Sequence, residues 1–399
     1  MPAPPASRLR ADRGFRLFWT ASTVSDLGSN ITMLAVQVLV VTTLAGSPTD
    51  VGLVSSARWL PYLALGILVG ALVDRVRRRP LLVGTDLARG LLLCAVPLLA
   101  WSDLLSVPVL CVLMAAFGLL SLVNDAAHQS FLPRLLPRES LTRANARLEQ
   151  SSSVAQASGP ALAGGLVSWV GAPLAVLVDA ASFLVSGLLT ARVPVQDPAP
   201  PRAARASLRT EMWEGLRWVY AHPLLRPLAL TTHLWFLFFS VLGAVYVPYV
   251  LLVLDGSALG LGLTLAATGV GGLLGSAAAE RFRPGWAVPG SHLLEAVGIA
   301  LIALAPDLWL AGTGQLLVGI GLGVSNPLEM AFRQTVTPDR LLARTNGTMR
   351  SLNRAAVVVG APLGGLLADS VGIRPALWVT VAGLAASGLL LLASPFRRA

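Results

Sequence analysis

Two ionisable residues lie deep inside long apolar stretches near the start of the chain, where a charge is costly and is therefore a candidate for function. Asp26 lies about 11 residues into the first stretch, roughly 16 Å along a helix that rises 1.5 Å per residue. Arg58 enters the next stretch from the opposite side and reaches a similar depth. We expect an Asp26–Arg58 pair that takes up and releases a proton. A permanent structural salt bridge is the alternative.

The neighbours of Asp26 indicate that its helix borders a wet cavity. At about 100° per residue, a stripe of residues shares the face of Asp26. These residues are Asn30, Met33 and Gln37. Because such a stripe is expected to avoid lipid, we predict that it contacts a bound molecule.

A later apolar stretch is rich in aromatic residues and is the expected counterpart of the first. It carries His233, Trp235 and Phe239. Aromatic side chains give broad apolar contacts with a few polar handles, which suits loosely specific binding of small molecules. Positions facing lipid or the membrane interface are the alternative for each of them.

Other charged residues within apolar stretches have near neighbours in sequence. Asp86 and Arg89 are three apart, and Glu329 and Arg333 are four apart, so helical pairing is the favoured interpretation for both. Glu295 is isolated, and the sequence indicates no partner for it.

The composition removes most enzyme chemistry. All 30 basic residues are Arg, so the Lys of a phosphate-binding loop or of a Schiff base is absent. Cys94 and Cys111 lie in apolar stretches without a CxxC pattern, and the four His are scattered without zinc-site spacing. We therefore expect no catalysis, no metal site and no cofactor.

The apolar stretches themselves predict an all-α integral membrane protein. The chain of 399 residues is 55% apolar and only 13% charged, whereas soluble domains carry about 25% charged residues. A membrane span needs about 20 apolar residues. Twelve such segments are predicted: 15–45, 50–73, 80–100, 107–131, 141–169, 172–192, 224–253, 258–282, 287–305, 308–333, 341–369 and 373–394.

The arginines predict the orientation of these spans. They concentrate in one set of loops and in both tails, and cytoplasmic loops carry such an excess. We therefore expect a multi-pass protein of the plasma or inner membrane with both termini cytoplasmic. The net charge of +10 is then an orientation signal, so no nucleic-acid partner is expected.

An internal repeat divides the chain into two halves. At a shift of 201 residues, Asn145 matches Asn346 and Gly164 matches Gly365. Each repeat has six spans, so two parallel, pseudo-symmetric six-helix bundles are predicted. We expect a cytoplasmic tail (1–13), a first bundle (14–192), a linker with an amphipathic helix (193–222), a second bundle (223–394) and a short tail (395–399). We expect a monomer in the lipid bilayer.

The loop after the second span resembles a signature of the major facilitator superfamily, G-x-x-x-D-R-x-G-R-R. The matching residues are Gly70, Asp74, Arg75, Arg78 and Arg79, while Arg77 replaces the second Gly. The resemblance implies a latch at the inner face, and a cluster of arginines that only sets orientation is the alternative. Glu149 and Arg350 occupy equivalent repeat positions with opposite charge, and we expect them to take part in the same gate.

Further stretches resemble the drug-exporter branch of that superfamily, which includes macrolide and enterobactin efflux proteins. They include 130–137, 159–165, 179–184 and 333–339. The resemblance implies a proton-coupled exporter of drug-like or secondary-metabolite molecules working by alternating access. The fourth span carries Met114 and Phe117 where the antiporter pattern would place Arg and Gln. A nutrient importer or facilitator and a membrane sensor without transport are the alternatives.

Overall fold

The computed structural model describes residues 12–73, 76–195 and 208–399, which are helical throughout without any strand. The first half comprises α2 (Arg13–Thr42), α3 (Pro48–Val73), α4 (Arg78–Trp101), α5 (Val107–Leu135), α6 (Arg138–Val170) and α7 (Ala172–Ala191). The second half comprises α9 (Leu225–Pro248), which continues as the π-helix η1 (Tyr249–Val253), α10 (Ala258–Ala279), α11 (Pro284–Leu304), α12 (Leu308–Val336), α13 (Asp339–Val371) and α14 (Ile373–Ala393). A short 3-10 helix, η2 (Pro395–Arg398), follows.

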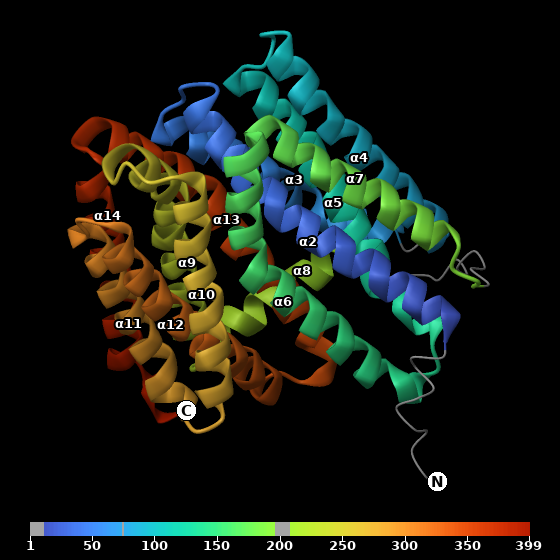
Figure 1. The fold of residues 1–399 in the computed structure, drawn as a ribbon. Helices are drawn as coiled ribbons and strands as arrows, with labels where there is room; N and C mark the ends of the chain where they lie inside the picture. The colour runs from blue at the N-terminus through green and yellow to red at the C-terminus, as the bar shows by residue number, and fades with distance from the viewer. Residues whose placement is uncertain (1–11, 74–75, 196–207) are drawn as a thin grey trace.

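Ten of the described helices are long and apolar enough to cross a membrane. The helices α3 and α6 fall outside this set, and α6 does so because its first half, residues 138–153, is polar. Both are nevertheless packed within the bundles (Figure 1). The predicted all-α membrane fold is therefore confirmed.

The two halves share one packing plan, as the repeat predicts. In the first half α2 packs on α6 and α7, and α4 packs on α5 and α7. In the second half α9 packs on α13 and α14, and α11 packs on α12 and α14. Between them lies α8 (Leu208–Ala221), which packs on α13 through an ion pair between Glu214 and Arg344.

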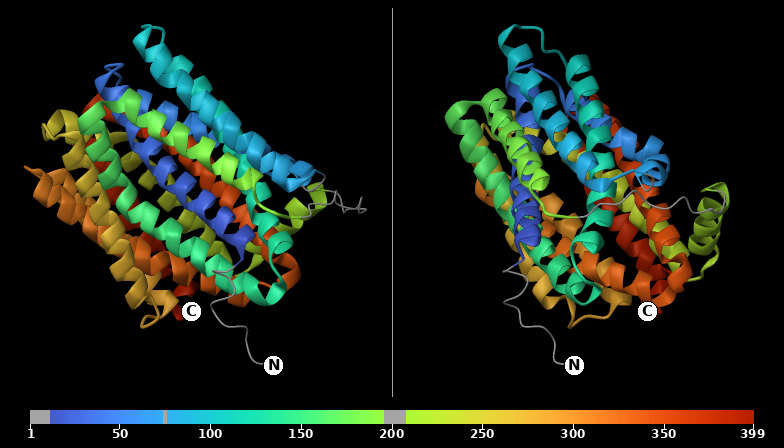
Figure 2. Two further views of the ribbon diagram at one scale, coloured as in Figure 1. Left: turned by 45° about the vertical axis from the view of Figure 1, so that its right-hand side comes forward. Right: turned by 90° about the vertical axis from the view of Figure 1, so that its right-hand side faces the viewer.

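The tight turns also repeat. Ala45 ends the α2–α3 turn with φ 49° and Asp255 occupies the corresponding turn before α10 with φ 48°. Gly171 and Gly372 adopt φ 82° and φ 99° between the last two helices of each half. The left-handed backbone at these positions reverses the chain within a few residues, so consecutive helices run antiparallel. The start of α2 and the end of α14 then lie at one face, the terminal face (Figure 2).

The halves meet along two seams, α3 against α13 and α6 against α10. A Cβ at Gly52 would overlap the carbonyl of Ala361, and one at Gly262 would overlap the carbonyl of Pro160. Small residues thus let the backbones touch. These contacts lie in the first half of α3 and α10 and in the last half of α13 and α6. They therefore close the face opposite the chain ends, called the opposite face below.

Polar caps reinforce both seams at equivalent positions. Asp369 of α13 accepts hydrogen bonds from Ser47 Oγ at 2.9 Å, from the Thr49 backbone N–H at 3.2 Å and from the Thr49 hydroxyl. Ser168 of α6, its repeat equivalent, accepts from the Leu259 backbone N–H at 2.9 Å. A carboxylate or hydroxyl at a helix start satisfies backbone groups that the helix itself leaves unpaired. Each half thus caps a helix of the other.

We expect Asp369→Ala to loosen the opposite face. A hydrogen bond to a charged group contributes up to about 1.5–3 kcal/mol, and the exposed site reduces this. We expect about a tenfold change in the open fraction, equivalent to about 1.4 kcal/mol. The measurement is the rate at which an impermeant maleimide, applied at the opposite face, labels Gly243→Cys in a background without Cys94 and Cys111.

The matched control for this experiment is Ser370→Ala, because the Ser370 hydroxyl bonds only to the Leu367 carbonyl of its own helix among the described contacts. Equal labelling rates in the two variants would show that the Asp369 contacts do not hold the face closed.

Candidate functional site

A cavity of about 840 Å³ lies between the halves. It is bounded by α2 and α6 of the first half and by α9, α10 and α12 of the second. Its lining reaches from Gln37 and Tyr246 to Glu149 on the first part of α6 and Ser276 on the last part of α10. The cavity therefore extends from the middle of the molecule toward the terminal face, while the seams close the other side.

Amide side chains dominate the polar lining of the cavity. Five amide residues contribute: Asn30, Gln37, Gln156, Gln315 and Asn326. Glu149 is the one charged residue among the described lining, and Phe239 and Tyr246 add aromatic surface. Amides both donate and accept hydrogen bonds, and a single carboxylate favours a cation. The cavity suits a neutral or cationic amphiphile with several polar groups.

Most of the residues expected to line the cavity do so. Asn30, Met33, Gln37 and Phe239 are among its walls, but two aromatic-stretch residues lie elsewhere. His233 bonds through Nε2 to the Tyr220 hydroxyl at 2.8 Å and through Nδ1 to Asn353 Oδ1 at 2.6 Å.

Trp235 is also absent from the walls, because its indole N–H donates to Glu295 at 2.5 Å behind Phe239. The repeat predicts that the aromatic stretch borders the cavity, but it does not reveal which of its side chains have polar partners on other helices.

Asp26 lies beside the cavity and not beside Arg58. Its carboxylate is half-buried and lies near Ser152 of α6. Its backbone carbonyl accepts from Asn30 at 2.8 Å. The charged groups that act on it are Asp125, Glu149 and Arg89.

Arg58 lies elsewhere, with its guanidinium 5.2 Å from the Phe117 ring. No ion pair joins Asp26 to Arg58 within the described residues. The reason is packing: α3 lies on α5 and α13, whereas α2 lies on α6 and α7. Equal depth on consecutive helices therefore does not bring their side chains together.

A cation–π contact crosses the α3–α13 seam near Arg58. The Arg354 guanidinium of α13 lies 3.6 Å from the Trp59 ring centroid of α3. One turn on, the Tyr62 hydroxyl donates to Asp125 of α5 at 2.7 Å. This arrangement joins the halves beside the cavity. Nothing in the sequence spacing connects α3 to α13, so the sequence did not indicate it.

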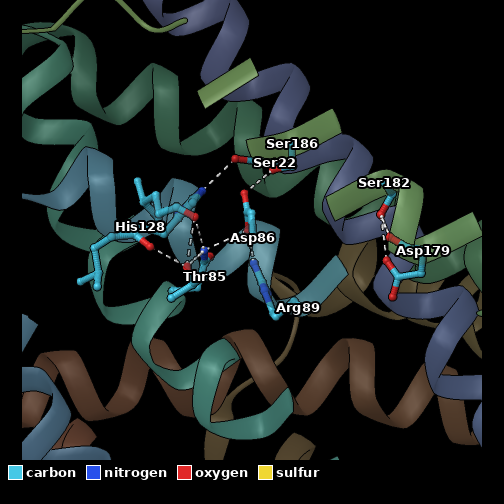
Figure 3. A network of polar contacts seen from close by, with 11 residues as sticks. Ser22, Thr85, Asp86, Arg89, His128, Asp179, Ser182 and Ser186 are labelled. Carbon is cyan, nitrogen blue, oxygen red and sulfur yellow. Dashed lines mark hydrogen bonds and ion pairs between the residues drawn. The ribbon is translucent and has the colours of Figure 1, made fainter. Parts of the chain in front are cut away.

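A buried network joins α4, α5 and α7 in the first half (Figure 3). Asp86 pairs with Arg89, as their spacing predicts. It also accepts from Ser186 at 2.7 Å and from Asn124 at 3.0 Å. The Arg89 guanidinium lies 4.1 Å from the Phe183 ring. The carboxylate is therefore neutralised and fully hydrogen-bonded, which suits a structural role.

The residues of the loop signature fasten helix ends. Gly70 lies within α3, and Asp74 and Arg75 lie outside the described residues. The buried Arg78 donates to the Val76 carbonyl at 2.7 Å and to Ser130 of α5 at 3.3 Å, and Arg79 donates to the Ala191 carbonyl at the end of α7. These contacts tie the start of α4 to two neighbours.

The two expected gate residues outside the loop, Glu149 and Arg350, are both exposed, and the described part of the chain has no ion pair between them. Glu149 lines the cavity.

We expect Arg89→Met to destabilise the protein strongly. The substitution leaves Asp86 as an unpaired buried charge, which costs about 3–5 kcal/mol. Adding Asp86→Asn removes the unpaired charge and should recover much of the lost stability. Thermal unfolding in detergent measures both variants. A single variant as stable as wild type would contradict the structural role of this pair.

The sequence matches the family described as transmembrane secretion effector over residues 5–399. It is 30% identical to the multidrug efflux pump Tap of Mycolicibacterium fortuitum over 369 residues, covering 89% of each chain. It is 29% identical to the enterobactin exporter EntS of Salmonella typhi over 401 residues, covering 97% of this chain and 93% of the exporter.

Solved structures share the fold at low sequence identity. The nucleoside transporter NupG aligns with a TM-score of 0.78 at 9% identity, covering 95% of this chain and 98% of that one. A bacterial homologue of the iron transporter ferroportin, in an inward-facing state, aligns with a TM-score of 0.75 at 16% identity, covering 96% and 98%. The helical fold, the central cavity and the family match along nearly the whole sequence all indicate the same class of protein. The chain belongs to the transmembrane secretion effector family of the major facilitator superfamily, and it is a multi-pass membrane transporter.

Proposed function

We propose that the protein exports neutral or cationic drug-like or secondary-metabolite molecules in exchange for protons, by alternating access. The observation that carries the proposal is the amide-lined cavity, which reaches toward the terminal face and is closed at the opposite face by the two seams. The efflux functions named for the relatives support export over import. Rocking one bundle against the other would close the terminal face and open the opposite one.

The arginine distribution supports an orientation with the terminal face in the cytoplasm. In that orientation the described state accepts molecules from the cytoplasm. Glu149 on one wall and the aromatic surface of Phe239 and Tyr246 on another give a cationic amphiphile one charged and one apolar contact.

Asp26 is our candidate for the coupling group. It lies near Ser152 where α2 meets α6, and its backbone carbonyl accepts a hydrogen bond from Asn30 of the cavity wall. Asp125, Glu149 and Arg89 are the other charged groups that act on it. A bound cation near Glu149 would favour ionisation of Asp26 and hence proton release. Arg58 makes no ion pair with Asp26. In this proposal it influences proton binding only through the electrostatic effect of its charge.

Asp26→Asn should abolish proton-driven transport while leaving the protein folded, because Asn keeps the shape and cannot ionise. The assay is ethidium uptake into inside-out vesicles with an imposed pH gradient. The matched control is Asp103→Asn, in an exposed turn with φ 54°, where Asn is well tolerated. Uptake at the wild-type rate in Asp26→Asn would rule out this residue as the coupling group. Absence of gradient-driven uptake in wild type would favour a facilitator or a sensor.

Glu149 and Arg350 should pair when the terminal face closes. We expect Glu149→Arg and Arg350→Glu to lower transport about tenfold or more as single variants, since like charges repel at contact distance. The double variant restores an opposite pair and should transport a neutral substrate faster than either single variant, while the arginine at position 149 still disfavours a cation in the cavity. A double variant slower than either single variant would contradict the gate.

A further inference from the structure

A second buried polar group lies behind the cavity wall, in the half of the molecule that does not hold Asp26. It is formed where α9, α11, α12 and α14 meet. Its members are Thr232, Trp235, His292, Glu295, Glu329 and Ser387. All are buried, and Glu295 is 0% exposed. The described residues form no cluster suited to a metal ion, so the chemistry here is that of protons and hydrogen bonds.

Glu295 is the least satisfied member of this group. Its Oε2 accepts the Trp235 indole N–H at 2.5 Å. Its Oε1 is buried without a hydrogen-bond partner and lies against Gly321, beside the backbone carbonyl of Ser291. An ionised carboxylate is expensive in such a place unless a cation pairs with it. A proton on Oε1 removes the charge.

His292 and Glu329 face each other in the same buried group as Glu295. The Ser387 hydroxyl lies 2.8 Å from the Leu384 carbonyl and 3.1 Å from His292 Nδ1. A hydroxyl has one hydrogen, and the carbonyl can only accept it, so Nδ1 carries its own hydrogen and donates to Ser387. The other ring nitrogen, Nε2, then faces the Glu329 carboxylate at 3.9 Å, beyond hydrogen-bond distance. The Thr232 hydroxyl lies 2.7 Å from the Leu228 carbonyl, which takes its hydrogen, and 3.4 Å from the Glu329 carboxylate.

The first half shows what is special about this group. There Asp86 contacts Ser186, as His292 contacts Ser387, and His128 contacts Ser22, as Glu329 contacts Thr232. The histidine and the carboxylate have exchanged helices between the halves. The larger difference lies one turn along the helix: α4 carries Arg89, paired with Asp86, whereas α11 carries Glu295. The Asp86 position of the first half is thus neutralised by an arginine on its own helix, whereas Glu295 takes the place of that arginine in the second half.

No fixed cation compensates the second-half group within the described residues. The nearest arginine, Arg333 of α12, acts on Glu329 electrostatically. It donates to the Glu329 backbone carbonyl at 3.3 Å and lies near Met330 Sδ at 3.9 Å, and it forms no ion pair with the carboxylate. The facing elements α9 and α14 contribute Trp235, Thr232 and Ser387, none of which carries charge. Neutralising Glu295 therefore requires a proton.

The group is connected to the cavity through one aromatic stack. The Trp235 ring stacks on Phe239 with centroids 4.4 Å apart and planes at 14°, and Phe239 lines the cavity. Loss of a proton from Glu295 would strengthen its hydrogen bond from the indole N–H. Movement of Trp235 would then move the cavity wall, and a molecule pressing on Phe239 would act on Glu295 in return.

We propose that Glu295, with His292 and Glu329, is a proton-binding site of the second half, and that Trp235 and Phe239 link it to the occupied cavity. The proposal rests on proton-coupled export as the function. Asp26 and this site would then lie on different halves, so that each bundle carries its own titrating group. Glu295 is a positioning residue in this scheme, because it does not touch the transported molecule.

The test uses wild-type protein, Glu295→Gln and the control Glu280→Gln, an exposed acid at the end of α10, reconstituted in vesicles. Gradient-driven accumulation of radiolabelled ethidium and its exchange without a gradient are both measured. We expect Glu295→Gln to keep exchange and to lose accumulation to the level seen without a gradient. Accumulation like wild type in Glu295→Gln overturns the proposal. Failure of wild type to accumulate overturns proton-coupled export instead.

Infrared difference spectroscopy between high and low pH tests the site independently of transport. We expect a carboxylic C=O band that is present in wild type and Asp26→Asn and absent in Glu295→Gln. Ethidium should shift this band in wild type, but not in Trp235→Phe, which keeps the acid and removes the link. If Glu295→Gln does not fold, the Trp235→Phe variant alone tests the proposal. The proposal is contradicted if the carboxylic C=O band is absent from Trp235→Phe, or if ethidium shifts the band in that variant as it does in wild type.

Discussion

The architecture depends on how closely two pairs of helices approach at the opposite face. At Gly52 and Gly262 the absence of a side chain lets α3 touch α13 and lets α10 touch α6. The two contacts occupy equivalent places in the repeat, and so do the caps made by Asp369 and Ser168. Because both seams lie on one side of the midplane, the halves diverge toward the terminal face and leave the cavity between them.

The two halves share a plan but differ in charge. Asp86 and Arg89 neutralise one another in the first half, while the corresponding part of the second half holds two carboxylates and a histidine without a paired cation. In the proposed mechanism the symmetric scaffold permits the rocking motion, whereas the unequal charges give each half a different response to protons. The cation–π contact between Arg354 and Trp59 joins the halves near the level at which these groups lie.

The sequence predicts the fold well because the length of each apolar segment and the repeat between the two halves can be read directly from the order of the residues. It predicted the cavity positions of Asn30 and Gln37 by helical spacing, and the Asp86–Arg89 pair by proximity on one helix. It failed where the partner lies on another helix. Asp26 and Arg58 were paired by depth alone, although α3 packs away from α2. The sequence also predicts Trp235 in the cavity wall. This prediction is wrong because the residue binds Glu295, which is 60 residues away and cannot be recognised as its partner from spacing along one helix.

The central claim is that the two faces open alternately, and distances across both faces test it most directly. Spin labels on exposed Thr142 and Arg340 report the terminal face, and labels on exposed Ser102 and Trp309 report the opposite face. Electron resonance distance measurements at high and low pH, with and without ethidium, should show one distance shortening as the other lengthens, in matching populations. Two distances that stay fixed, or that lengthen together, would contradict the account.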